Sequence, residues 1–131
     1  MIDPLRYIRK GLIAALPGID IYDIIAEENG EPPYAVVNLA SYTVVDGSCD
    51  MINAKVDFIM FDLYGRKGHS LPLDQLSDQV LTVLVTGETS LTIDNYQVTK
   101  CTIINSTSDG VLLFNRMMYR RTFKFELLLS T

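Results

Sequence analysis

The stretch RMMYRRTFKFELLLS, residues 116–130, decides the fold class. Apolar or aromatic side chains stand at alternate positions from Met117 to Leu129, interrupted at Arg121, and most residues between them are polar or charged. A period of two is typical of a β-strand that has one face on a core and the other in water. We therefore expect a long strand here, and such a strand needs partner strands elsewhere in the chain.

Two earlier segments have the composition of long strands. YAVVNLASYTVV, residues 34–45, is rich in β-branched and aromatic side chains, and AKVDFIMFDLYG covers residues 54–65. The connection between them is short and contains Asp46–Gly47, which predicts an antiparallel hairpin. Weaker strand patterns cover residues 19–25 and 96–105. We expect residues 106–115 to form a loop with a turn at Asp109–Gly110.

Two segments have helical periodicity. In residues 3–16, Asp3 is a suitable N-cap, Pro4 fits the first helical position, and Pro17–Gly18 ends the pattern. Its apolar stripe consists of Leu5, Ile8, Leu12 and Leu16. Ser70 can cap a second helix over residues 71–85, for which Gly87 is the expected stop. The stripe of that helix consists of Leu73, Leu76, Val80, Val83 and Leu84.

The order of these segments predicts an α+β fold. The expected architecture is a mainly antiparallel sheet of about four to five strands with two helices packed on one face. The 131 residues suit one domain, residues 1–131, with a core of its own.

The strand expected at residues 54–65 is apolar on both faces. Phe58, Met60 and Tyr64 share one face, whereas residues 59, 61 and 63 share the other. A strand with one wet face would not have this pattern, so we expect a neighbouring subunit to cover the second face. Asp57 and Asp62 interrupt the apolar run, and we expect either an ion pair with Arg121 or a polar subunit boundary. The candidate subunit-interface residues are Phe58, Met60, Asp62, Tyr64, Arg120 and Lys124.

Few residues suggest catalysis or cofactor binding. His69 is the single histidine, and GRKGHS, residues 65–70, lacks the spacing of a phosphate-binding P-loop. Cys49 and Cys101 have neither the spacing of a zinc site nor that of a disulfide scaffold, so we interpret both as reduced thiols. We therefore expect no catalytic residues, no cofactor and no metal.

The charge is negative and unevenly distributed. The net charge is −5, and residues 1–64 hold four basic and ten acidic side chains, against seven and six in residues 65–131. Gripping DNA phosphates requires clustered lysines and arginines, so this balance opposes tight DNA binding but not the passage of DNA nearby. We expect no membrane partner, because no apolar run is long enough to span a bilayer.

Four patterns, in this order, resemble the tail terminator (tail completion) family of long-tailed bacteriophages, which is related to head–tail joining and minor tail proteins. They are the amphipathic helix that ends in LPGIDIYDII, then EPPYAVVNLA, then AKVDFIMFDLYG followed by LDQLSDQVLTVL, and finally SDG leading to MYRRTFKFEL. The likeness spans residues 4–129. The chain departs from the family pattern at residues 87–96, where the expected loop is longer and more polar than in the family.

The resemblance implies a structural virion protein without an active site. Its α+β subunits would form a ring, commonly a hexamer, that caps the tail tube and joins it to the head while DNA passes through. The implied partners are copies of itself, the tail tube protein and head-completion or connector proteins. The implied location is the head–tail junction of the virion, after assembly in the host cytoplasm.

Two other interpretations remain open. A head-closure or other connector ring would have nearly the same sequence features. A small ligand-binding α+β domain is the alternative from a different class, and a purified protein that holds a ligand would favour it. On the ring hypothesis, Met60→Asp is expected to leave the subunit folded and to block assembly.

Overall fold

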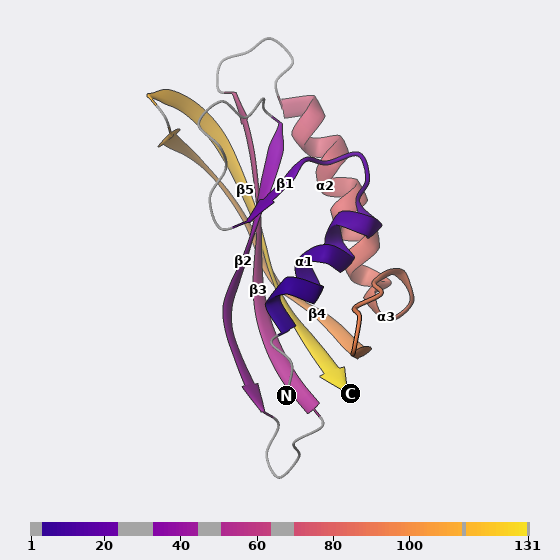
Figure 1. Ribbon diagram of the computed structural model, residues 1–131. Helices are drawn as coiled ribbons and strands as arrows, with labels where there is room; N and C mark the ends of the chain where they lie inside the picture. The colour runs from indigo at the N-terminus through magenta and orange to yellow at the C-terminus, as the bar shows by residue number, and fades with distance from the viewer. Residues whose placement is uncertain (1–3, 24–32, 45–50, 64–69, 114, 131) are drawn as a thin grey trace.

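A computed structural model describes residues 4–23, 33–44, 51–63, 70–113 and 115–130 (Figure 1). Its helices are α1 (Pro4–Ala15), α2 (Ser70–Val85) and the single turn α3 (Gly87–Ser90). Its strands are β1 (Ile21–Asp23), β2 (Tyr34–Val44), β3 (Met51–Leu63), β4 (Gln97–Leu113) and β5 (Arg116–Ser130). The expected α+β fold class is confirmed.

The strands form a five-stranded sheet in the order β1-β2-β3-β5-β4. β1 pairs with β2 in parallel, and every other neighbouring pair is antiparallel. The predicted pairing of the two long strands is confirmed, with Val36 opposite Ile59 and Val37 opposite Phe58. β5 lies between β3 and β4, so the alternating stretch that predicted a strand is an inner strand of the sheet.

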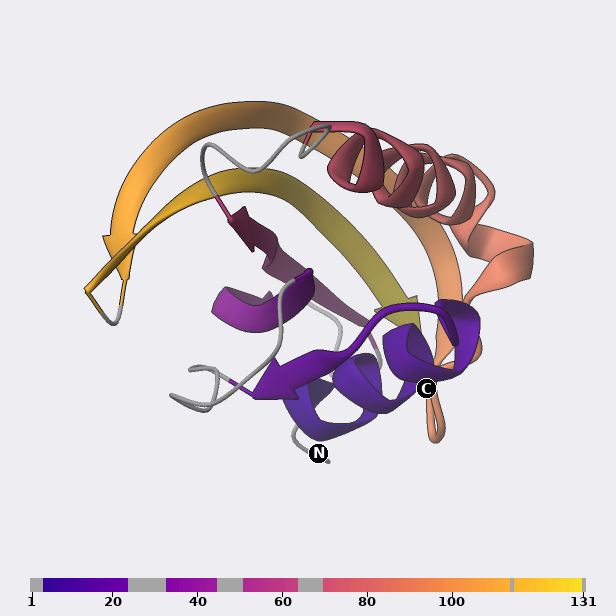
Figure 2. The same cartoon turned by 90° about the horizontal axis from the view of Figure 1, so that it is seen from above.

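One hydrophobic core joins both long helices to the sheet. Ile8, Leu12 and Leu16 from α1 share it with Leu73, Val80 and Leu84 from α2. Alternate residues of β3 and β5 complete it, namely Ala54, Val56, Phe58, Met60, Phe123, Phe125, Leu127 and Leu129. Figures 1 and 2 show α1 and α2 on the same side of the sheet. The helix stripes and the strand alternation of the sequence therefore meet in one buried layer.

The hairpin of β4 and β5 is longer than the sequence suggested. Residues 106–113, expected to be a loop, continue β4, and Asp109 and Gly110 lie opposite Arg120 and Tyr119 instead of forming a turn. The turn lies beyond Leu113, where Asn115 has a φ of 60°, a left-handed conformation that asparagine tolerates. Asp109 accepts hydrogen bonds from Arg120 across the strands, and this pair favours continued strand pairing at the Asp–Gly dipeptide.

Gly87 begins α3 and does not simply end α2. A Cβ atom at residue 87 would lie 2.6 Å from Cβ of Cys101 on β4. α2 ends at Val85, just before the expected stop, and the glycine itself is explained by the close approach of α3 to the sheet.

Candidate interaction surface

Phe58 and Met60 are core residues, so their expected role at a subunit interface is wrong. Both side chains are 0% exposed and lie in the core shared with α1 and α2. Because both faces of β3 are apolar, its sequence could not indicate which face the helices cover. Asp62 is also buried, and its Oδ1 accepts a hydrogen bond of 2.8 Å from the backbone N–H of Leu63. Tyr64 lies outside the described residues.

The opposite face of β3 packs within the subunit at one end of the sheet. Tyr34, Val36, Phe61 and Met118 form a second buried cluster there. The ring of Tyr34 is 5.5 Å from the ring of Phe61 and 5.6 Å from that of Tyr22, measured between centroids. Burial raises the pKa of the Tyr34 hydroxyl. The second apolar face that suggested a neighbouring subunit is therefore partly satisfied by the subunit itself.

Arg120 and Lys124 lie on the face of the sheet that points away from the core. Arg120 Nε donates a hydrogen bond of 2.9 Å to Asp109 Oδ1, and Arg120 Nη2 donates to Asp109 Oδ2. The hydrogen bond from this guanidinium holds the pKa of the Asp109 carboxyl below its ordinary value. Lys124 is exposed. Of the predicted interface residues that the structure describes, Lys124 and the partly exposed Arg120 are the ones that a neighbour can reach.

Arg121 contacts α2, whereas the sequence suggested a pair with Asp57 or Asp62. Its Nη1 donates to Asp74 Oδ1 at 2.8 Å and to Ser77 Oγ at 2.9 Å. Its Nε donates to Ser108 Oγ on β4 at 3.1 Å. The guanidinium thus joins β4, β5 and α2, a geometry that depends on where α2 crosses the sheet.

The far end of the β4–β5 hairpin exposes a pair of apolar side chains. Leu112 and Met117 lie directly opposite each other and are 64% and 50% exposed. We call residues 110–113 and 116–118 the hairpin tip. Figures 1 and 2 show it at one end of the molecule, on the opposite side from α1 and α2. Leu112 was not predicted as a surface residue of a strand because residues 106–115 were expected to form a loop, although the apolar run at 111–113 indicated a possible strand.

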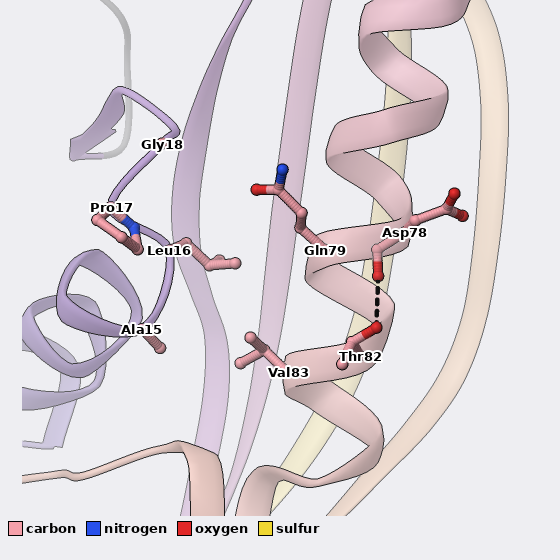
Figure 3. Close-up of a pocket in the computed structure, with 8 residues that line it drawn as sticks. All are labelled: Ala15, Leu16, Pro17, Gly18, Asp78, Gln79, Thr82 and Val83. Atoms are coloured by element: carbon pink, nitrogen blue, oxygen red, sulfur yellow. Dashed lines mark hydrogen bonds between the residues drawn. The ribbon is translucent and has the colours of Figure 1, made fainter.

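A groove separates the end of α1 from α2 (Figure 3). Its volume is about 610 Å³, and its lining residues are Ala15, Leu16, Pro17, Gly18, Asp78, Gln79, Thr82 and Val83. In Figure 3, Gln79 and Val83 extend towards α1, while the Asp78 carboxylate points away. Thr82 Oγ1 donates a hydrogen bond of 2.8 Å to the backbone carbonyl of Asp78. The groove is lined mainly by apolar side chains, as expected for a docking site.

The part of the chain that the structure describes was compared with the requirements of a metal site and of a membrane-spanning helix. In it, no group of three or more His, Cys, Asp or Glu residues could hold a metal ion. Within the same ranges, no helix has the length and apolar character needed to cross a bilayer. His69 and Cys49 lie outside these ranges, and Cys101 is a free, half-buried thiol.

No protein-family model matches the chain, and no curated protein matches it either. Function must therefore be inferred from the surfaces described above and from the sequence resemblance.

Proposed function

We propose that this protein is a structural subunit of a phage tail terminator that forms a ring at the end of the tail tube. The ring caps the tube and joins it to the head, and DNA passes through its centre. In this role the chain is not an enzyme and carries no cofactor. Its partners are other copies of itself, the tail tube protein and the connector proteins of the head. The sequence patterns that resemble the terminator family support this identity.

The exposed hairpin tip is the observation that carries the assembly role. Single exposed apolar residues are common on monomers. Here two of them, Leu112 and Met117, are paired across the strands at the end of a hairpin of 17-residue and 15-residue strands. A hairpin that reaches away from the helices presents this pair to another molecule and not to its own core.

The charge distribution supports a channel through which DNA can slide. The net charge of −5 disfavours a grip on phosphates. On the exposed face of the sheet, two cations are paired with neighbouring acids, Arg120 with Asp109 and Lys55 with Glu126, whose charged atoms are 3.9 Å apart. A surface of this kind leaves little positive potential to hold DNA.

The first experiment is native mass measurement over protein concentrations from about 1 μM to 1 mM, with negative-stain images of any large species. This range covers association free energies of about −8 to −4 kcal/mol. We expect closed rings with an open centre, because heterologous contacts that close by rotation give cyclic symmetry. A protein that stays monomeric over the whole range, or that forms only open filaments, would contradict the ring.

The groove between α1 and α2 favours a second candidate, a small ligand-binding domain. Its volume is about 610 Å³, and it is an open groove with a mainly apolar lining. Native mass spectrometry of the freshly purified monomer tests this alternative, since a bound ligand adds a defined mass. A ligand that is retained in wild type and lost in Thr82→Arg would favour binding over assembly.

A further inference from the structure

We draw no further inference here: the strongest candidate, the exposed apolar pair of Leu112 and Met117 at the hairpin tip, belongs to the surface already proposed for assembly, and nothing in the structure shows what covers it.

Discussion

Gly11→Ala measures how closely α1 packs against the segment before β4. Gly11 is buried in the middle of α1, and a Cβ atom there would lie 2.6 Å from the carbonyl oxygen of Thr92 and 3.3 Å from Cγ1 of Ile93. In an exposed helix, alanine would stabilise by about 1 kcal/mol relative to glycine. Overpacking costs about 1–3 kcal/mol, and a backbone carbonyl cannot rotate aside as a side chain can. The clash should therefore outweigh the helix preference.

We expect Gly11→Ala to lower the free energy of unfolding by about 1–2 kcal/mol, which lowers Tm by roughly 3–8 °C in a domain of this size. Urea denaturation at one fixed protein concentration measures the change, so that any self-association contributes equally. Gly18→Ala is the control, because its added Cβ would lie 3.8 Å from Oε1 of Gln79, an ordinary contact, and we expect a change within about 0.5 kcal/mol. A Gly11→Ala protein as stable as wild type, or more stable, would refute the packing argument.

Three further predictions follow from buried and paired groups. Met60→Asp places a carboxylate in the core, so we expect the free energy of unfolding to fall by roughly 4 kcal/mol or more and the circular dichroism spectrum to be that of an unfolded chain. A variant that folds but does not assemble would restore the interface role of Met60. Burial raises the pKa of the Cys101 thiol to about 11. In a Cys49→Ser background, we expect alkylation of Cys101 at pH 8 to be at least roughly 100-fold slower in the folded protein than in urea, and its rate to increase with pH up to about pH 11. Arg120 lowers the pKa of the Asp109 carboxyl, so this pair stabilises the fold at pH values above the carboxyl pKa of the unfolded chain, and the stabilisation is lost as the pH falls through the lower pKa of the folded protein. Arg120→Gln should raise the Asp109 pKa measured by NMR. An unchanged pKa would exclude the pair in solution.

The short connection between β2 and β3 predicted their antiparallel pairing, whereas the apolar pattern predicted the inner strands themselves. It could not predict which face of β3 lies under the helices, because Phe58 on one face and Phe61 on the other are both large and apolar. Composition at one strand does not record the position of a helix that is distant in sequence. For this reason the interface hypothesis assigned core residues to the surface.

The turn of the second hairpin was misplaced for a different reason. Asp109–Gly110 has the composition of a tight turn, and only the register shows that Asp109 pairs with Arg120 across the strands. Moving the turn towards Asn115 lengthens β4 and creates the exposed pair at the tip. The groove had no local sequence pattern at all, because Leu16 and Gln79 come from helices that meet only in the folded chain.

Arg121 ties the β4–β5 hairpin to α2 through two of its three hydrogen bonds. The guanidinium links β5 to Asp74 and Ser77 on α2 and to Ser108 on β4. Swinging the hairpin relative to α2 would break the two bonds to Asp74 and Ser77, at roughly 1 kcal/mol each. A force applied to the hairpin is therefore transmitted to α2 at Asp74, one turn from the groove residue Asp78.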